Sequence, residues 1–235
     1  MNVNHIIVVI PYYKNELTTY EKFSLNRALK VLSRYPIVFI SPEELSISPE
    51  YQHINVQRFD NEYFQALRGY NRLLLSDNFY KRFLDYKYIL IYQLDALVFN
   101  DEIDYWISLN YDYYGAPWNK TWKKRYYNFY GLVKRKVGNG GFSLRKTAVF
   151  YKMTKRIRRI AKYIRFGEDI FWCNYGNLVY PNLKIIDQDL AVRFAFESEP
   201  EKLFSRNGNK LPFGCHAYEK NDLSFWRKMI LDLPY

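Results

Sequence analysis

Residues 86–101 read YKYILIYQLDALVFND, and this stretch decides the fold. Residues 88–94 are almost continuously apolar or aromatic, which is typical of a central strand covered on both faces. A carboxylate, Asp95, follows this strand at once. An ionised carboxylate that is buried without a partner costs several kcal/mol, so Asp95 has to meet a cation, N–H donors or water.

The expected position of Asp95 is a cleft, because open α/β sheets bind ligands beyond the carboxyl ends of their strands. Asp95 is therefore a candidate site residue, with a metal ion as the expected partner. An aspartate that caps the following turn is the alternative, and the strand position alone does not separate the two.

Strands and helices alternate over the first hundred residues. Strands are predicted at 6–10, 36–42 and 56–59, and helices at 21–34 and 64–83, the latter with a break at Asp77-Asn78. This alternation predicts a parallel sheet and a nucleotide-binding half over residues 1–100. Neither a Gly-rich dinucleotide fingerprint nor a P-loop is present.

The second half, residues 101–235, is less regular. Residues 111–118 predict a strand and a Pro-Trp turn, 120–136 a basic aromatic loop, and 137–145 a turn that leads into a short strand. Residues 150–166 predict a helix with an apolar face and seven Lys or Arg on the opposite face. No repeat or linker separates the halves, so residues 1–235 are assigned to a single domain.

Composition narrows the class. The 235 residues are 49% hydrophobic and 20% aromatic, which excludes a disordered chain and suffices for one sizeable core. The net charge of +11 favours acidic partners: phosphates, anionic lipid or nucleic acid. Cys173 and Cys215 share no metal-type spacing with the histidines, which predicts free thiols in a reducing compartment. The N-terminal apolar run is too short for a signal peptide or a span, so a cytoplasmic location is expected.

Four features carry the candidate chemistry: Asp95 after the buried strand, the Gly-rich turn 138–141, Glu168-Asp169 at an expected helix start, and the late His216. The turn offers backbone N–H groups at close approach, the helix dipole favours carboxylates at its N-terminus, and histidine is a common metal ligand. Each also has a structural explanation, as a hairpin, a helix cap or a core histidine. Their order along the chain favours the functional one.

This order of parts resembles the GT-A type of nucleotide-sugar glycosyltransferase, and the resemblance is closest to the bacterial family DUF5672, a domain of GT-A-like transferases. The segments that carry it span most of the chain: 90–98 (LIYQLDALV), 113–118 (YYGAPW), 137–145 (VGNGGFSLR), 167–171 (GEDIF) and 214–216 (GCH). The resemblance implies a single-domain, GT-A-like α/β/α sandwich with a mostly parallel central sheet.

The resemblance also implies site residues. Asp95 is similar to the last carboxylate of the metal-binding Asp-x-Asp motif, and His216 to the late histidine that completes the metal site. The donor would be bound by Gln93 and Asp95 and by the turn residues Asn139, Gly140 and Gly141. The sequence departs from the family pattern at Gln93, where the motif has a carboxylate, so weaker metal binding or a metal-independent enzyme is left open.

For the reaction itself, the resemblance makes Asp169 the general base, and Glu168 is expected to hold an acceptor hydroxyl. Pro11, Tyr12 and Glu16 occupy the place where GT-A enzymes hold the nucleobase and ribose. Arg68 and Arg72 are candidates for contacting the phosphates. The alternative is that both are solvated, which is the more ordinary state of a surface arginine. Tyr12, Trp118 and Trp172 are candidates for stacking on a base or a sugar, against the alternative of core packing.

The expected function is transfer of a sugar from a nucleotide-diphosphate donor to a glycan or lipid-linked acceptor, with inversion, in bacterial surface polysaccharide or glycoconjugate synthesis. Mn²⁺ or Mg²⁺ is the expected cofactor, because a divalent cation stabilises the charge of a diphosphate leaving group. The basic face of residues 150–166 predicts peripheral binding to an anionic membrane. Two alternatives stand: a basic, aromatic-rich nucleic-acid binder, and a metal-dependent nuclease that uses Asp95, Glu168 and Asp169. The transferase hypothesis predicts no nucleic-acid partner.

Overall fold

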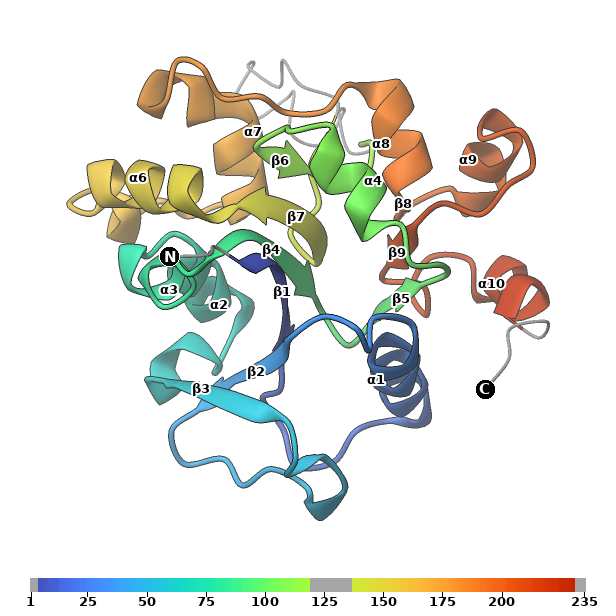
Figure 1. Ribbon diagram of the computed structural model, residues 1–235, viewed down its shortest axis with the longest axis horizontal. Helices are drawn as coiled ribbons and strands as arrows, with labels where there is room; N and C mark the ends of the chain where they lie inside the picture. The colour runs from blue at the N-terminus through green and yellow to red at the C-terminus, as the bar shows by residue number, and fades with distance from the viewer. Residues whose placement is uncertain (1–3, 119–136, 231–235) are drawn as a thin grey trace.

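The computed structural model describes residues 4–118 and 137–230, and its centre is a six-stranded sheet (Figure 1). The strand order is β3-β2-β1-β4-β7-β6. These strands are β1 (Asn4–Pro11), β2 (Ile37–Pro42), β3 (Asn55–Phe59), β4 (Tyr86–Tyr92), β6 (Tyr113–Tyr114) and β7 (Phe142–Lys146). All pairs from β3 to β4 are parallel, and β7 runs antiparallel to both of its neighbours. The mostly parallel sheet is as predicted.

Strand β4 is central and buried, as its sequence predicts. Every residue from Tyr88 to Tyr92 is fully buried. On one side Ile89 pairs with Ile7 of β1, and on the other Leu90 pairs with Leu144 of β7. Two paired neighbours and two covered faces explain why this segment is apolar without alternation.

Helices cover both faces of the sheet. They are α1 (Thr19–Val31), α2 (Leu67–Leu74), α3 (Asp77–Lys81), α4 (Ile103–Ser108), α6 (Thr147–Ile157), α7 (Glu168–Val179), α8 (Gln188–Phe194), α9 (Pro200–Arg206) and α10 (Leu223–Ile230), with short 3₁₀ turns η1 (Pro49–Tyr51), η2 (Asn61–Tyr63) and η3 (Ala161–Tyr163). In Figure 1, α2, α3 and α6 lie together on one side of the sheet, and α1 lies on the other. The predicted break between the helices of residues 64–83 is present, with Ser76 as the N-cap of α3.

A second, three-stranded sheet continues the chain beyond β4 and has the order β5-β9-β8. It consists of β5 (Ala96–Val98), β8 (Ala195–Phe196) and β9 (Gly214–His216). Helix α1 anchors this sheet, because Arg27 donates hydrogen bonds to the carbonyls of Val98 and Phe99. The antiparallel pairing of Ala96 with His216 brings the late histidine beside Asp95.

The bounds predicted for the helix over residues 150–166 are wrong. Helix α6 begins earlier, at Thr147, and ends at Ile157, after which the chain forms η3. Basic residues are favourable near the exposed carbonyls of a helix C-terminus, and Lys155 and Arg156 lie in the last turn of α6. Ile160, expected on the core face, is instead 53% exposed. The predicted basic loop at 120–136 lies outside the described residues.

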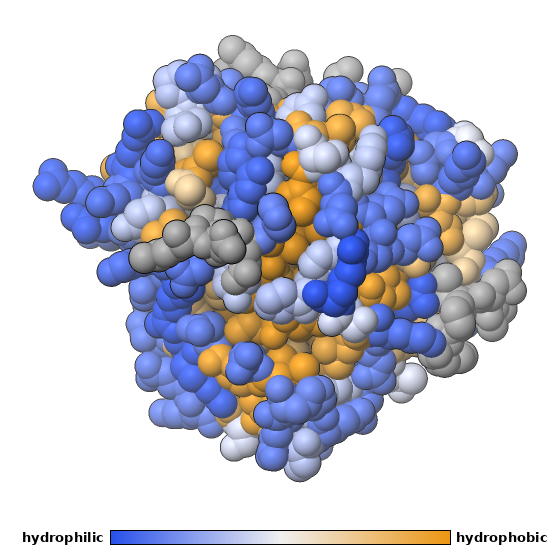
Figure 2. All heavy atoms as spheres, in the orientation of Figure 1, coloured by the Kyte–Doolittle hydropathy of each residue, from blue (hydrophilic) through white to orange (hydrophobic). Residues whose placement is uncertain are grey.

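The face of the molecule drawn in Figure 2 shows hydrophobic residues along a central band with hydrophilic residues on both sides. Residues from Ile6 to Phe213 contribute to one large hydrophobic cluster, and a smaller cluster surrounds Trp226. In the described part of the chain, no helix has both the length and the apolar character needed to cross a membrane.

Candidate functional site

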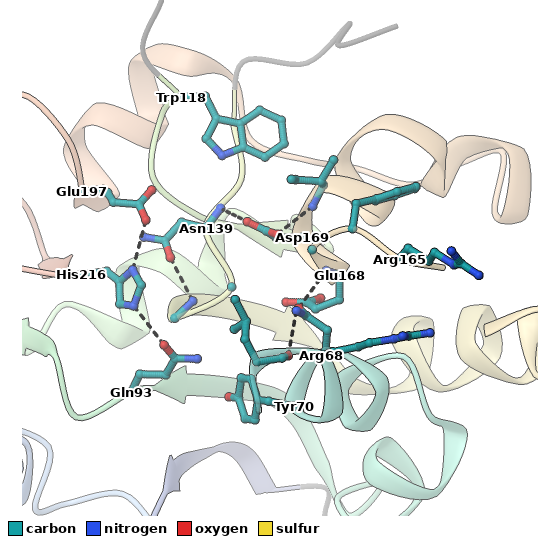
Figure 3. A pocket seen from close by; sticks show the side chains of 17 residues that line it. Arg68, Tyr70, Gln93, Trp118, Asn139, Arg165, Glu168, Asp169, Glu197 and His216 are labelled. Carbon is teal, nitrogen blue, oxygen red and sulfur yellow. Dashed lines mark hydrogen bonds and ion pairs between the residues drawn. The ribbon is translucent and has the colours of Figure 1, made fainter. Parts of the chain in front are cut away.

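A cavity of about 450 Å³ lies beside the carboxyl end of β4 (Figure 3). Its walls come from α2, from the turn at 139–141, from the start of α7, and from β8 and β9. The lining residues are Leu67, Arg68, Tyr70, Asn71, Gln93, Trp118, Asn139, Gly140, Gly141, Arg165, Phe166, Gly167, Glu168, Asp169, Ile170, Glu197 and His216. The cavity therefore contains residues from all five segments that carry the family resemblance.

A second cavity, of about 440 Å³, adjoins the first one. The two share Leu67, Tyr70 and Gln93 as lining residues. The second cavity extends past Asp95 and Lys220 to Pro11 at the end of β1. Together they form a site that runs from the end of the first strand to Asp169 at the start of α7.

His216 is the polar centre of the junction between the cavities. Its Nε2 atom lies 3.0 Å from Oε1 of Gln93 and 3.1 Å from Oδ1 of Asp95, and its Nδ1 atom lies 3.2 Å from Oε1 of Glu197. Burial opposes protonation of the ring, but the hydrogen bonds that the ring donates to Asp95 and Glu197 raise the pKa of His216 to about 10. Although burial raises the pKa of Asp95, its hydrogen bonds to His216 and Lys220 outweigh burial and hold that pKa well below its usual range.

Side chains of the types that bind divalent cations meet at this junction. No group of three His, Cys, Asp or Glu side chains in the described ranges is arranged as a metal site. Asp95, His216 and the amide oxygen of Gln93 nevertheless converge, and Glu197 holds the second ring nitrogen, as a carboxylate does behind many metal-bound histidines. Lys220 also reaches this group, with its Nζ 2.9 Å from Oδ2 of Asp95.

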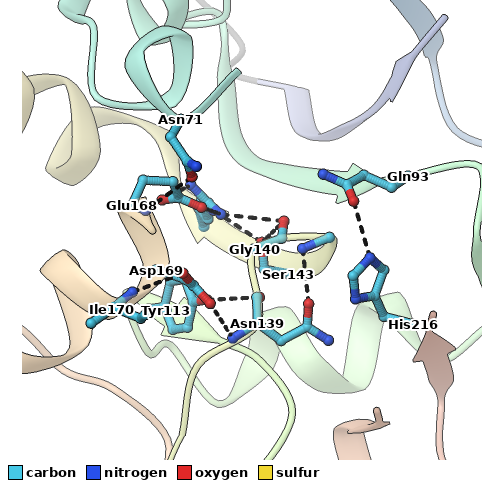
Figure 4. Close-up of polar contacts among 12 residues, drawn as sticks. Asn71, Gln93, Tyr113, Asn139, Gly140, Ser143, Glu168, Asp169, Ile170 and His216 are labelled. Atoms are coloured by element: carbon cyan, nitrogen blue, oxygen red, sulfur yellow. Dashed lines mark hydrogen bonds and ion pairs between the residues drawn. The ribbon is translucent and has the colours of Figure 1, made fainter. Parts of the chain in front are cut away.

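The Gly-rich turn lies directly against His216 and requires small residues. Asn139 has a φ of +74°, and its Oδ1 accepts a hydrogen bond from the N–H of Gly141 (Figure 4). A Cβ atom on Gly141 would lie 2.0 Å from Nε2 of His216, and one on Gly140 would lie 2.3 Å from Oε1 of Glu168. The two glycines let the main chain approach both functional groups closely.

Asp169 lies on the cavity wall at the first turn of α7, where it was predicted to face a site. Its Oδ2 accepts a hydrogen bond from the N–H of Asn139 at 2.9 Å, and its Oδ1 accepts one from the N–H of Ile170 at 2.8 Å. Burial raises the pKa of Asp169 above the ordinary value of an aspartate. The two hydrogen bonds fix the carboxylate beside the Gly-rich turn.

Glu168 is 2% exposed and is held by the fully buried Arg145. The guanidinium donates to both carboxylate oxygens, at 2.7 Å and 2.9 Å, in a bidentate pair. Burial raises the pKa of Glu168, and the charge of Arg145 opposes that rise. Arg145 also donates to the hydroxyl of Tyr80, so the pair ties α3, β7 and α7 together. Both carboxylate oxygens of Glu168 thus already have a hydrogen-bond partner within the protein.

The predicted nucleobase residues divide between two places. Pro11 lines the second cavity, whereas Tyr12 and Glu16 line a separate hollow of about 350 Å³. Tyr12 is fully buried and stacks on Phe39 at a centroid distance of 5.0 Å, so its ring packs in the core and cannot stack on a base. Its neighbour Tyr13, which is 46% exposed, lines the second cavity instead.

Of the tryptophan and arginine candidates, one of each pair lines the cavity and the other does not. Trp118 lines the first cavity, but Trp172 is fully buried in the core. Arg68 lines the first cavity, whereas Arg72 pairs with Glu62 at 3.0 Å.

Four residues of the site were not predicted from the sequence: Tyr13, Arg145, Glu197 and Lys220. Arg145 carried a signal, because it lies in a predicted strand, and an arginine that becomes buried in a strand needs an anionic partner. Glu197 and Lys220 carried none, since β8 and the segment after β9 have no distinctive local pattern.

Family comparison decides the membership of the chain. Residues 53–216 match the family described as protein of unknown function (DUF5672). The chain belongs to this family. The matched DUF5672 region begins before β3 and ends at His216, and it contains Gln93, Asp95, the Gly-rich turn and Asp169. No protein with a curated description matches the sequence.

Solved structures similar to this DUF5672 protein establish its fold as GT-A-like. A glycosyltransferase involved in glycosylation of the major capsid of PBCV-1 aligns with a TM-score of 0.56 at 12% identity, covering 97% of this chain and 99% of that one. The galactosyltransferase LgtC aligns with a TM-score of 0.58 at 14% identity, covering 97% and 96%. Mouse xyloside xylosyltransferase 1 aligns with a TM-score of 0.52 at 14% identity, covering 91% and 97%.

Proposed function

We propose that this protein is a glycosyltransferase that moves a sugar from a nucleoside-diphosphate sugar to an acceptor hydroxyl. One observation carries the proposal. The Asp95–His216 pair and the Asp169 carboxylate line two adjoining cavities that begin at the end of β1. A transferase needs this order of parts: a place for a nucleotide, a cationic diphosphate site, and a carboxylate beyond it.

The donor would lie in the second cavity, which residues of the 1–100 half line together with Glu219 and Lys220. Pro11 and Tyr13 are near the end of β1, and Lys220 adds a positive charge opposite Asp95. A lysine is a common phosphate ligand, and an exposed tyrosine offers a face for a base or a ribose. The solved structures with this fold include a galactosyltransferase in complex with donor and acceptor sugar analogues, which supports this assignment.

Asp95, His216 and Gln93 would hold Mn²⁺ or Mg²⁺. When bound, such a cation stabilises the negative charge of a diphosphate leaving group. Lys220, which already contacts Asp95, can add charge to the same group without a metal. The site therefore suits a divalent cation, although one carboxylate of the usual Asp-x-Asp motif is replaced by Gln93.

We assign inversion to the reaction, with Asp169 as the general base. The acceptor oxygen forms a bond to the anomeric carbon, the bond from that carbon to the phosphate oxygen breaks, and the nucleoside diphosphate leaves with the electron pair. The acceptor proton passes to Asp169. A carboxylate whose pKa is raised by burial is a stronger base than a solvated one, which suits this role.

A glycan or lipid-linked acceptor in bacterial surface polysaccharide synthesis fits a protein held at an anionic membrane. The support is the basic segment from α6 to Arg165, where Ile160 and Tyr163 are 53% and 68% exposed between cationic side chains. Its cationic residues are Lys152, Lys155, Arg156, Arg158, Arg159, Lys162 and Arg165. Exposed apolar groups among cations favour peripheral binding to anionic lipid.

A metal-dependent nuclease is a weaker candidate. Its three proposed carboxylates would have to share a cation, but Glu168 is occupied by Arg145, and no such cluster is found within residues 4–118 and 137–230. Nucleic-acid binding is supported only by charge and aromatic content.

Thermal stability measured with added ligands separates these functions. The protein should be stabilised by at least one of UDP, GDP, CDP or dTDP, more strongly with Mn²⁺, because a ligand that binds only the folded state raises the melting temperature. Single-stranded oligonucleotides at the same concentration should have a smaller effect. Stabilisation by oligonucleotides alone would favour the nucleic-acid hypothesis.

A further inference from the structure

Two arginines stand at the open side of the first cavity. Arg68 comes from α2 and Arg165 from the segment before α7, and both are exposed while lining the cavity. In Figure 3 both side chains lie on the side of the cavity away from Gln93, His216 and Glu197, with Asp169 between the two groups. The cavity thus has a cationic rim at the end away from the proposed donor site.

Neither arginine has a carboxylate partner among the described residues. The acidic groups that line the cavity are already engaged: Glu168 by Arg145, Asp169 by the N–H of Asn139, and Glu197 by His216. The sequence before Arg165 offers no carboxylate either, because residues 113–167 contain no Asp or Glu. Arg72, one turn from Arg68, differs because it pairs with Glu62.

An apolar surface accompanies the two charges. Leu67, next to Arg68, is 75% exposed and lines the cavity, and Phe166, next to Arg165, lines it as well. A ligand at this rim would meet two guanidinium groups with apolar side chains beside them. Two exposed arginines on elements that are distant in sequence, both at one cavity, are more specific than a general basic surface.

We propose that Arg68 and Arg165 bind a phosphate group carried by the acceptor. This inference rests on the proposed transferase function and names the acceptor's chemical class: a phosphorylated sugar or glycan. The donor diphosphate is assigned to the opposite end, beside Asp95 and Lys220, so a second anion site beyond Asp169 belongs to the other substrate. Guanidinium groups match phosphate oxygens in geometry, and two positive charges suit a dianionic phosphate better than a monoanionic carboxylate.

Binding of small probes tests the assignment. Glucose 1-phosphate should bind the wild-type protein more tightly than glucuronate, and methyl glucoside should bind most weakly, as measured by calorimetry with the nucleoside diphosphate present. The nucleotide occupies the donor end, so the probes report on the rim. Equal binding of glucose 1-phosphate and methyl glucoside would overturn the proposal, and equal binding of glucuronate would overturn the assignment to phosphate.

Matched variants locate the site. Arg68→Ala and Arg165→Ala together should weaken binding of glucose 1-phosphate by about ten- to a hundredfold, since hydrogen bonds to charged groups are among the strong ones. The control is Arg72→Ala with Arg159→Ala, which removes the same number of charges from neighbouring positions that do not line the cavity. An equal loss in the control pair would show a general charge effect and contradict the proposal.

Donor hydrolysis distinguishes a failure of this inference from a failure of the proposed function. Release of nucleoside diphosphate from the donor in the absence of an acceptor, measured with the wild-type protein, reports on donor use independently of the acceptor site. If the wild-type protein releases nucleotide but shows no preference for the phosphorylated probe, the transferase stands and the acceptor assignment falls. If no nucleotide sugar is used at all, the proposed function itself fails.

Discussion

The Nε2 atom of His216 lies 3.0 Å from Oε1 of Gln93, 123 residues earlier in the chain. The same atom lies 3.1 Å from Oδ1 of Asp95. The three side chains meet because β5 continues directly from the β4 turn and pairs with β9. Gln93 is therefore the position at which a single substitution can add a carboxylate to the proposed cation site.

Gln93→Asp should strengthen metal-dependent nucleotide binding. The substitution adds a carboxylate beside Asp95, and ligand charge raises the affinity of oxygen sites for divalent cations. We expect the Mn²⁺ concentration needed for half-maximal nucleotide binding to fall by roughly tenfold, within the range by which groups around a metal change its affinity. Gln65→Asp is the control, because Gln65 lines the same second cavity without contacting His216 in the described contacts. Equal effects of the two variants would argue against a cation at Gln93.

Asp169→Asn should abolish sugar transfer while nucleotide binding persists. The variant keeps the shape of the side chain and removes its basicity, so the rate constant should fall by about 10²–10⁴-fold. Asp189→Asn, at a side chain that is 89% exposed, is the control. Transfer at the wild-type rate in Asp169→Asn would exclude Asp169 as the base and favour a retaining mechanism.

The pH dependence of kcat/KM in the wild-type protein also tests whether Asp169 is the base. Because burial raises the pKa of Asp169, the base becomes active only as pH rises above the ordinary range of an aspartate. The acidic limb of kcat/KM should therefore lie at higher pH than that of a solvated carboxylate, and it should disappear in the residual activity of Asp169→Asn.

Arg145→Ala should strongly destabilise the fold. It leaves the Glu168 carboxylate buried without a partner, a loss of about 3–5 kcal/mol in the free energy of unfolding. Arg206→Ala removes an exposed ion pair with Asp189 and should change stability far less. Denaturant unfolding measures both. Replacing Arg145 and Glu168 together by Met should recover much of the loss, since no charge stays buried, and a small effect of Arg145→Ala alone would contradict the role of the pair.

Binding to membranes should depend on the segment after α6. The protein should co-sediment with vesicles of anionic lipid at low salt, not with neutral vesicles, and it should be released near 1 M salt, where the Debye length is about 3 Å. Arg158→Glu should weaken this binding more than Lys228→Glu, which makes the same charge change on α10. Equal binding to both lipids, or to neither, would leave the positive charge as a feature of the substrate site alone.

The parts of the structure that depend on local pattern were predictable. The buried β4, the break before α3 and the helix start at Glu168 each follow from spacing or a capping residue. Asp95 was recognisable because a carboxylate after a fully apolar strand needs a partner. The late His216 was placed through the family resemblance, since no local pattern predicts the pairing of β5 with β9.

The incorrect predictions concern the direction in which a side chain points and the residue at which a helix ends. Tyr12 and Tyr13 have the same chemistry, and only the direction of the chain after β1 puts Tyr12 in the core and Tyr13 at the cavity. The apolar spacing of residues 150–166 continues beyond the end of α6, but Ile160 has no core to contact there. That Glu168 holds an acceptor hydroxyl stays a prediction; its partner within the fold, Arg145, lies on a separate strand that local spacing cannot align with it.

Release of nucleoside diphosphate from a panel of UDP-, GDP-, CDP- and dTDP-linked sugars, with Mn²⁺ present, tests the central claim most directly. The account predicts that the wild-type protein turns over at least one of these donors, and that Asp169→Asn binds the same nucleotide without turning the donor over. If no donor in the panel is bound or cleaved, while single-stranded oligonucleotides bind tightly, the protein is not a nucleotide-sugar transferase.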